Sequence, residues 1–263
     1  MSYLDIEPWR LLIVFALVLV SSLVVSLRAR LGLARELIVG LLRGAAQLFA
    51  VGYLLIVIFE QEGPGWVLVV LSVMLSVAAW TSARRVEHGP GARRLAPYAL
   101  AAVAAGSGLA LVPVFALVVT PTPWFDARHV IPISGIVIAN AMNVVAQVNE
   151  RIFATAHAER AEIEQWLALG ATPKQALAGP SRRALRAALI PTINSLLTLG
   201  LVSLPGMMTG QIVSGVAPEH AVRYQLVIMY QLVIVAAVSG ATAAFLARRL
   251  LFTAGEQLRR SWP

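Results

Sequence analysis

Cysteine is absent from the 263 residues of the sequence, and charged residues are scarce. Without cysteine the chain can form neither a disulfide framework nor a thiolate metal site, and it has no cysteine nucleophile. Charged residues make up 13% of the chain and hydrophobic residues 59%, whereas soluble domains are about 25% charged and about 45–50% apolar. The main solvent of such a chain is lipid, so we predict an all-α integral membrane protein.

The sequence also lacks the motifs of common hydrolytic sites. No G-x-x-x-x-G-K-[ST] run occurs, so the chain cannot bind and hydrolyse ATP through a P-loop of its own, and neither H-E-x-x-H nor G-x-S-x-G is present. The four histidines lie in different predicted loops, at positions 88, 129, 157 and 220. We therefore expect no enzymatic activity, and no metal or cofactor bound by this chain. A membrane-bound enzyme or scaffold is the alternative.

Long apolar runs, separated by charges or by glycine and proline clusters, predict a polytopic bundle of about seven transmembrane helices. A bilayer-spanning helix needs about 20 apolar residues, and together the runs use most of the chain. We therefore expect a single membrane domain over residues 1–263, without a large soluble module. The runs cover residues 9–27, 36–59, 66–82, 95–120, 130–149, 187–204 and 221–246.

Arginine and lysine are distributed unevenly between the predicted loops. Most of the 21 basic residues fall in four stretches, residues 28–35, 84–94, 151–186 and 248–260, which lie on one side of the predicted membrane. Because cytoplasmic loops carry the excess of positive charge, we expect the N-terminus outside and the C-terminus in the cytoplasm. Residues 1–8 lack a basic region, so the first run is expected to be a retained helix rather than a cleaved signal.

The polar segment of residues 151–186 predicts a helix, a sharp turn and a second, short helix. Gly170 suits the C-terminus of the first helix, because a left-handed conformation costs glycine little. Thr172 and Pro173 are a suitable N-cap and first residue for the second helix. A further break is expected at Gly179, which is followed by proline and serine.

A short helix that projects from a membrane domain could fit a groove on a separate cytoplasmic ATPase and carry its movement to the spans. The run from Glu164 to Ala171 resembles the coupling loop of ABC permeases, in which an acidic residue precedes a glycine by six positions. The alternative is an ordinary surface helical hairpin. The candidate coupling residues are Glu164, Leu169, Gly170, Ala171, Thr172, Pro173, Lys174 and Gln175.

Four polar residues share one face of the fifth predicted span. They are Asn140, Asn143, Gln147 and Glu150, whose spacing of i, i+3, i+7 and i+10 aligns them along a helix. Polar side chains at membrane depth face protein or water rather than lipid. We interpret this face as a wall of a transport path that ends in a carboxylate at the cytoplasmic mouth. Hydrogen bonding between helices is the alternative.

Two further polar or broken segments lie within predicted spans. Arg43 and Gln47 form an i, i+4 pair in the second span, where they either line the path or anchor the helix at the membrane surface by snorkelling. The segment of residues 204–211 contains helix breakers, which at membrane depth are tolerated only where the backbone is buried in protein or lines a cavity. It predicts a re-entrant or gating element with Pro205, Met207, Met208 and Gln211 at the path, and its two thioethers could contact a soft cation such as Cu(I).

Four segments together resemble one family, the FetB-type permeases of bacterial ABC transporters, which are linked to iron export and have plant relatives linked to aluminium tolerance. The resemblance covers residues 36–252. The segments are Arg43-Gly44 with Gln47-Leu48 and Gly52, then Asn140-Ala141-Met142-Asn143, then Leu167 to Pro173, and finally Leu204 to Gln211 with Gly215 and Tyr224-Gln225.

The resemblance implies a transmembrane permease domain in the bacterial plasma (inner) membrane. It also implies a separately encoded cytoplasmic ATPase that uses ATP, two copies of this permease in the assembly, and export of metal ions, iron foremost. We expect no nucleic acid among the partners. The alternatives are a secondary carrier driven by an ion gradient and an ABC permease for a non-metal organic substrate.

Overall fold

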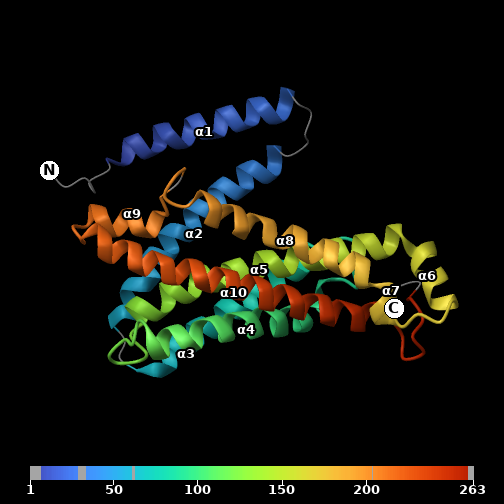
Figure 1. Ribbon diagram of the computed structural model, residues 1–263. Coiled ribbons are helices and arrows are strands. Elements are labelled where there is room, and N and C mark those ends of the chain that lie inside the picture. The colour runs from blue at the N-terminus through green and yellow to red at the C-terminus, as the bar shows by residue number, and fades with distance from the viewer. Residues whose placement is uncertain (1–6, 29–33, 61–62, 203, 260–263) are drawn as a thin grey trace. The chain divides into compact units, whose positions relative to one another are not determined.

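The computed structural model describes residues 7–28, 34–60, 63–202 and 204–259, and in these ranges every named element is a helix. The chain forms two compact units, residues 1–62 and residues 63–263. Figure 1 shows the helices in chain order from α1 to α10. For the described residues, the all-α prediction is confirmed.

The first unit consists of two helices, α1 (Pro8–Arg28) and α2 (Ala34–Glu60), which contact each other. Within α2, Leu37–Glu60 is long and apolar enough to cross a membrane. Helix α1 contributes a shorter described apolar stretch, Trp9–Val24.

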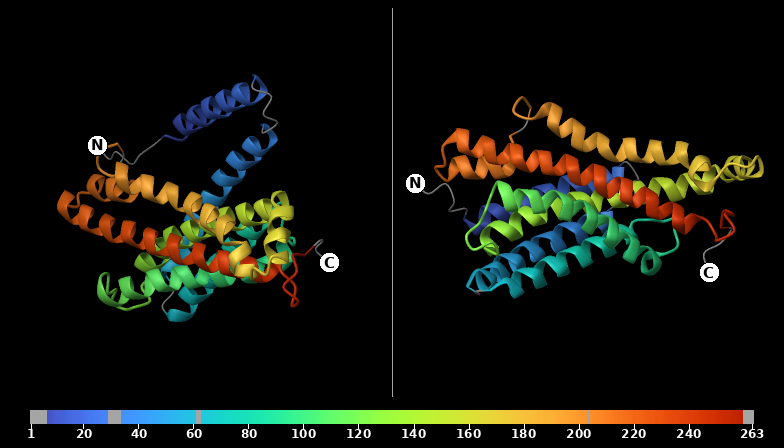
Figure 2. Two further views of the ribbon diagram at one scale, coloured as in Figure 1. Left: turned by 45° about the vertical axis from the view of Figure 1, so that its right-hand side comes forward. Right: turned by 60° about the horizontal axis from the view of Figure 1, so that its bottom comes forward.

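The second unit is built from five long helices and three short ones within its described residues. The long helices pack into one bundle in which α5 contacts α3, α4, α8 and α10, and Figure 2 shows the same arrangement from two further sides. The long helices are α3 (Pro64–Arg84), α4 (Ala92–Leu117), α5 (Ala127–Ala158), α8 (Ala178–Thr198) and α10 (Pro218–Leu251). The short helices are α6 (Arg160–Ala168), α7 (Pro173–Ala176) and α9 (Gly206–Val213).

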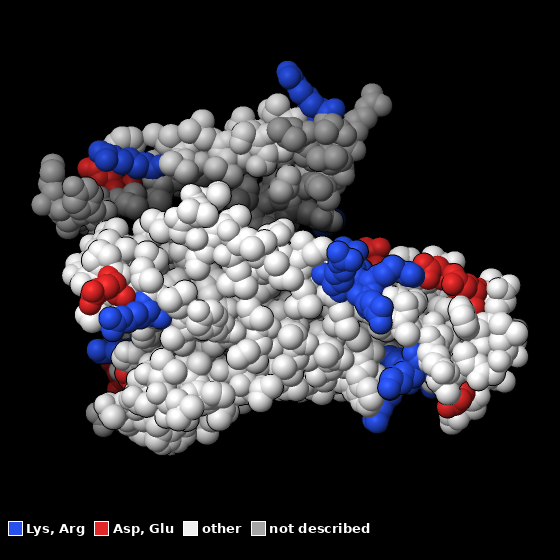
Figure 3. All heavy atoms as spheres, in the orientation of Figure 1, with Lys and Arg blue, Asp and Glu red and all other residues white. Residues whose placement is uncertain are grey.

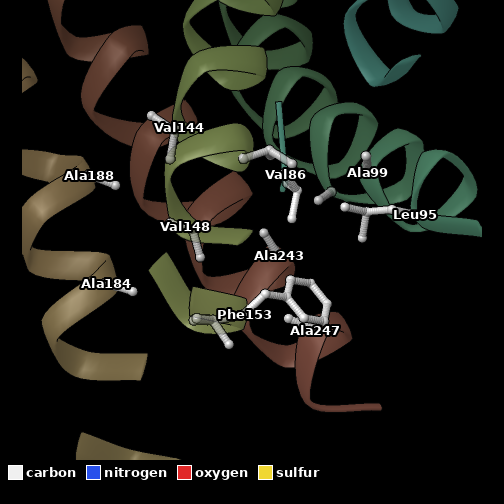
Figure 4. Packing of buried hydrophobic residues seen from close by; sticks show 14 of the residues in the cluster. Val86, Leu95, Ala99, Val144, Val148, Phe153, Ala184, Ala188, Ala243 and Ala247 are labelled. Atoms are coloured by element: carbon white, nitrogen blue, oxygen red, sulfur yellow. The ribbon is translucent and has the colours of Figure 1, made fainter. Parts of the chain in front are cut away.

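Small residues allow the long helices to approach closely. A Cβ atom on Gly106 of α4 would lie 1.9 Å from the hydroxyl oxygen of Ser239 on α10. Ala99 and Ala243 are buried in the same core, and Phe153 fills it near the end of α5 (Figure 4). Such contacts are typical of helix packing in membranes, where small side chains let backbones come close.

The described part of the chain contains five helices long and apolar enough to cross a membrane, within α2, α3, α4, α5 and α10. The prediction of a polytopic helical protein is therefore consistent with the structure. The count of seven stays a prediction, because the described apolar stretch of α1 is short and the first turns of α8 carry Arg182, Arg183 and Arg186.

The sixth predicted span is displaced relative to the helix that the structure contains. We expected a break at Gly179 and a span over residues 187–204, but α8 begins at Ala178 and ends at Thr198. Pro180 does not break the helix because it lies in the first turn, where a missing N–H costs no hydrogen bond. Beyond Thr198 the chain turns at Gly200, whose φ is +76°.

Helix α5 begins with a side-chain cap. One carboxylate oxygen of Asp126 accepts a hydrogen bond of 3.1 Å from the backbone N–H of Arg128, which satisfies a donor of the first turn. The other lies 2.5 Å from Nδ1 of His129, and this hydrogen bond lowers the pKa of Asp126 below its ordinary value of 3.8. The cap therefore stabilises the first turn of α5 at Asp126.

Candidate functional site

The four polar residues predicted to line a path do lie on one face of α5. Asn143 is exposed, while Asn140, Gln147 and Glu150 are partly buried. Residues between them on the helix, such as Val144, point into the core. At about 1.5 Å per residue the stripe is about 15 Å long, and Asn140 lies near the middle of the 32-residue helix. We call Asn140, Asn143, Gln147 and Glu150 the α5 stripe.

The connection between α3 and α4 covers the far end of the α5 stripe. Arg85 donates a hydrogen bond of 3.1 Å from Nη1 to Oδ1 of Asn143. The backbone N–H of Glu87 donates one of 2.8 Å to Oε2 of Glu150. These contacts could not be predicted from the sequence, because no local pattern links residues that are 58 and 63 positions apart.

Two histidines meet beside Glu150. Nδ1 of His88 lies 3.4 Å from Oε1 of Glu150, and the rings of His88 and His157 have their centroids 5.6 Å apart. The sequence did not indicate this contact, which forms because the connection after α3 folds back onto the end of α5. Within the described residues no group of three or more His, Cys, Asp or Glu side chains is arranged to hold a metal ion.

Several polar atoms are buried between helices without a hydrogen-bond partner. Asn140 of the α5 stripe has such an atom, its Oδ1. Gln231 of α10 donates a 3.5 Å hydrogen bond to the carbonyl of Ala110, but its Oε1 has no partner. An unpaired buried polar group costs about 1–3 kcal/mol, so this interior is more polar than packing alone requires. The other unpaired atoms belong to Ser107, Ser134, Gln225 and Ser239.

Arg43 and Gln47 lie one turn apart on α2 in the first unit. Both side chains are exposed within that unit. The i, i+4 relation expected from the sequence is present because α2 is continuous from Ala34 to Glu60. Their role, at the path or as an anchor, stays a prediction.

Helix α8 ends at Thr198, before residues 204–211, and this segment instead begins a new helix. Pro205 occupies the N-cap position of the eight-residue α9, which packs against α10. Met207, Met208 and Gln211 lie on α9 and are partly buried. The chain does break between α8 and α9, but the break begins at Thr198, earlier than predicted. The gating role of these residues stays a prediction.

The segment between α5 and α8 has the turn predicted from its sequence. Gly170 has a φ of +87°. Its N–H bonds to the carbonyl of Leu167 and the next N–H, of Ala171, bonds to the carbonyl of Trp166, both at 3.0 Å, which is a Schellman motif. Thr172 and Gln175 then form a capping box at the start of α7. We call residues 164–175 the coupling segment.

Apolar side chains are exposed on the coupling segment. Leu169 is 82% exposed and Trp166 is 52% exposed, beside a groove that Gly170, Ala171 and Gln175 also line. Figure 1 shows α6 and α7 at one end of the second unit, outside the bundle of long helices. The remaining coupling residues lie here too, namely Glu164 on α6 and Pro173 and Lys174 on α7. The structure thus brings this whole predicted set together.

Charged side chains concentrate at the end of the unit that carries α6 and α7. Figure 3 shows lysine and arginine gathered there on the face drawn, with an uncharged band beside them. Arg183 of α8 pairs with Glu159 at 2.5 Å, and Arg160 of α6 pairs with Glu164 at 2.8 Å. The first pair joins α8 to the residue between α5 and α6, and the second lies within α6.

Comparisons with known proteins identify relatives along almost the whole chain. The family described as "Uncharacterised protein family (UPF0014)" matches residues 8–252. The Probable iron export permease protein FetB of Escherichia coli (strain K12) is 33% identical over 92% of this chain and 91% of its own length. Protein ALUMINUM SENSITIVE 3 of Arabidopsis thaliana is 35% identical over 92% of this chain and 86% of its own.

A third relative matches from end to end. The UPF0014 membrane protein YjkA of Bacillus subtilis (strain 168) is 34% identical over 99% of this chain and 100% of its own length. No solved structure matches the chain.

Proposed function

Because the chain belongs to the UPF0014 family of membrane proteins, we propose that it is the permease subunit of an ABC transporter that exports metal ions, iron foremost, across the bacterial inner membrane. A separate cytoplasmic ATPase hydrolyses the ATP that drives export. The name of the Escherichia coli relative supports the substrate class. The long apolar helices of both units support the membrane location.

The observation that carries the proposal is the capped turn of the coupling segment. Its backbone groups are satisfied by the Schellman motif and by the capping box, so it forms a firm surface, and it exposes Trp166 and Leu169. Helix α6 follows α5 directly, and α7 leads into α8. An ATPase that grips this turn would therefore move two helices of the bundle together.

The α5 stripe is the proposed wall of the path. Its exposed amide at Asn143 should not face lipid, so we expect another protein surface to cover it. A second copy of the chain supplies that surface when the two stripes face each other, which is why we propose a homodimer. Amide and carboxylate oxygens suit a hard cation in transit, and Arg85 and Glu87 would close the mouth of the path at Glu150.

The orientation that we propose places the α6–α7 end in the cytoplasm. Basic residues gather at that end of the second unit, in agreement with the excess of positive charge in cytoplasmic loops. The ATPase then binds where it can reach ATP. The turn around α9, at the other end of α8, faces outward and would gate the outer end of the path.

The test of this function is ATP-driven transport in liposomes. The chain and its co-purifying ATPase are reconstituted with a metal-sensitive dye inside, and ATP is added outside with Fe²⁺, Mn²⁺ or Zn²⁺. We expect Fe²⁺ accumulation that requires both ATP and the ATPase. Accumulation driven by an ion gradient without ATP would favour a secondary carrier, and transport of organic compounds alone would contradict the metal assignment.

A further inference from the structure

A small hairpin follows α10 and folds back on the end of that helix. Phe252 and Leu258 pair as an antiparallel bridge, and the N–H of Thr253 bonds to the carbonyl of Gln257 at 2.9 Å. The N–H of Arg259 returns to the carbonyl of Leu251, also at 2.9 Å. We call residues 252–259 the α10 hairpin.

The α10 hairpin is anchored to the bundle and to α6. Phe252 and Leu258 are buried and belong to the main core. Arg160 of α6 donates two hydrogen bonds of 3.2 Å from its guanidinium, to the carbonyls of Leu258 and Arg259. The same guanidinium pairs with Glu164 of the coupling segment, so one side chain ties the hairpin to that segment.

The α10 hairpin is the shared wall of two grooves beside the coupling segment. The first groove, of about 660 Å³, lies between Gly170 and Ala171 on one side and the hairpin on the other. The second, of about 490 Å³, lies between residues 172–174 and the end of α10 with its hairpin. A protein that occupies either groove therefore contacts both the coupling segment and the hairpin.

The second groove is strongly basic. Lys174 from the coupling segment, Arg248 and Arg249 from α10, and Arg259 from the hairpin line it, together with a single acidic residue, Glu256. We expect a protein surface that fits this groove to supply carboxylates, because the basic side chains of the groove would repel basic groups on the partner. The charge of the groove thus specifies the chemistry of its partner.

We propose that the α10 hairpin and the coupling segment form one composite docking site for the cytoplasmic ATPase, and that the basic groove between them receives acidic side chains of that ATPase. The inference rests on the proposed function, since it assumes that an ATPase binds the coupling segment. It adds a second contact surface, far away in the sequence, and an electrostatic component to the binding. Arg160 is the positioning residue that keeps the two parts in register.

The first test is site-specific photocrosslinking in the purified complex of this chain with its co-purifying P-loop ATPase. The chain has no cysteine, so single cysteines can carry a benzophenone probe without background. Probes are placed at Ala254 in the hairpin and at Ala168 beside the coupling turn. A probe at Ala217, at the opposite end of α10, is the control; all three residues are exposed.

We expect the probes at Ala254 and Ala168 to capture the ATPase and the probe at Ala217 to capture none. Capture from Ala168 without capture from Ala254 would overturn the composite site and leave the proposed function intact. Failure at both positions in a complex that still contains the ATPase would contradict the coupling assignment itself. Equal capture from all three positions would show that the crosslinks are unspecific and would also overturn the inference.

The second test reverses one charge in the basic groove. Arg259→Glu retains the backbone carbonyl that Arg160 holds but changes the side chain that lines the groove. We expect several-fold weaker ATPase binding, with a smaller dependence on salt than in the unaltered chain. Arg93→Glu is the control, because Arg93 is an exposed residue of α4 that lies outside both grooves. Equal affinity of the Arg259→Glu variant and the unaltered chain would overturn the electrostatic component. If the groove binds anionic lipid vesicles rather than the ATPase, lipid replaces the ATPase as its occupant.

Discussion

The short helices α7 and α9 lie on either side of α8 in the chain. Each lies next to a glycine turn of the same type, but the chemical surroundings of the two turns differ. Gly170 precedes α7 and Gly215 follows α9, with φ values of +87° and +91°. At both glycines two backbone hydrogen bonds of 3.0 Å complete a Schellman motif. The side chains differ, since the coupling segment carries a capping box and an ion pair, whereas none of the eight residues of α9 is charged and Pro205 provides no side-chain cap.

This difference indicates that the two turns suit different surroundings. A turn stabilised by charged and hydrogen-bonding side chains suits water and a protein partner, which is the setting proposed for the coupling segment. An uncharged turn with partly buried Met207 and Met208 suits the membrane and a gating role. In the function that we propose, the same backbone turn serves ATPase docking at one end of α8 and the transport path at the other. The following variants test that division.

The largest effect is expected from Gly170→Val. A β-branched residue at a φ of +87° is strained by about 1–2 kcal/mol, so the coupling turn should distort. We predict at least a tenfold loss of ATP-driven transport while ATP hydrolysis continues, measured in the same proteoliposomes. Gly108→Val is the control, because a Cβ there meets nothing within 4 Å and φ is not positive. Normal coupling in the Gly170 variant would contradict the docking role of the turn.

Glu150→Gln should have the next largest effect. It removes the negative charge at the end of the α5 stripe but retains an oxygen that can accept the hydrogen bond from Glu87. We predict transport lowered several-fold with an unchanged amount of bound ATPase, assayed by dye uptake and by pull-down. Glu219→Gln, an exposed carboxylate at the start of α10, serves as the control. Unchanged transport would remove Glu150 from the path.

Thr172→Ala should have a moderate, local effect. Loss of an N-cap costs about 1 kcal/mol, and the hydroxyl of Thr172 is one half of the capping box. We predict faster hydrogen exchange in α7 and a few-fold weaker coupling. Thr209→Ala on α9 is the counterpart, since that hydroxyl bonds only to the carbonyl of Pro205 and caps no helix. Equal effects of the two changes would remove the proposed contrast between the turns.

The smallest effect concerns the cap of α5. The pKa of Asp126 is lowered in the folded chain, chiefly by its hydrogen bond with His129. Its charge therefore stabilises the fold above the unfolded pKa, and that contribution is lost as pH falls through the lower folded pKa. We predict a lower thermal stability for Asp126→Asn at neutral pH, followed by thermal unfolding in detergent. The difference should shrink as the pH falls below 3.8, the ordinary pKa of this carboxyl group. A constant difference at every pH would contradict the ionic contribution.

Local features of the structure could be predicted from the sequence. Gly170 and Thr172 act through their own backbone and their nearest neighbours, so residue type and spacing specified the turn and the cap. The α5 stripe followed from helical periodicity in the same way. Each of these predictions depended on residues within a few turns of one another.

Long-range contacts could not be predicted in this way. The bonds from Arg85 to Asn143 and from Arg160 to Leu258 join residues 58 and 98 positions apart, and only the packing of the helices brings them together. The start of α8 was misplaced for a different reason. Pro180 was read as a break although a proline in a first turn is tolerated.

The most direct test of the central claim is a pull-down of the tagged chain from mild detergent, with an assay of the eluate for ATPase activity across a panel of metals. We predict a co-purifying P-loop ATPase whose rate rises with iron. With Gly170→Val the ATPase should still hydrolyse ATP, but iron should no longer raise its rate. If the folded chain elutes without an ATPase, the coupling role of residues 164–175 is contradicted, and transport driven by an ion gradient becomes the function to test.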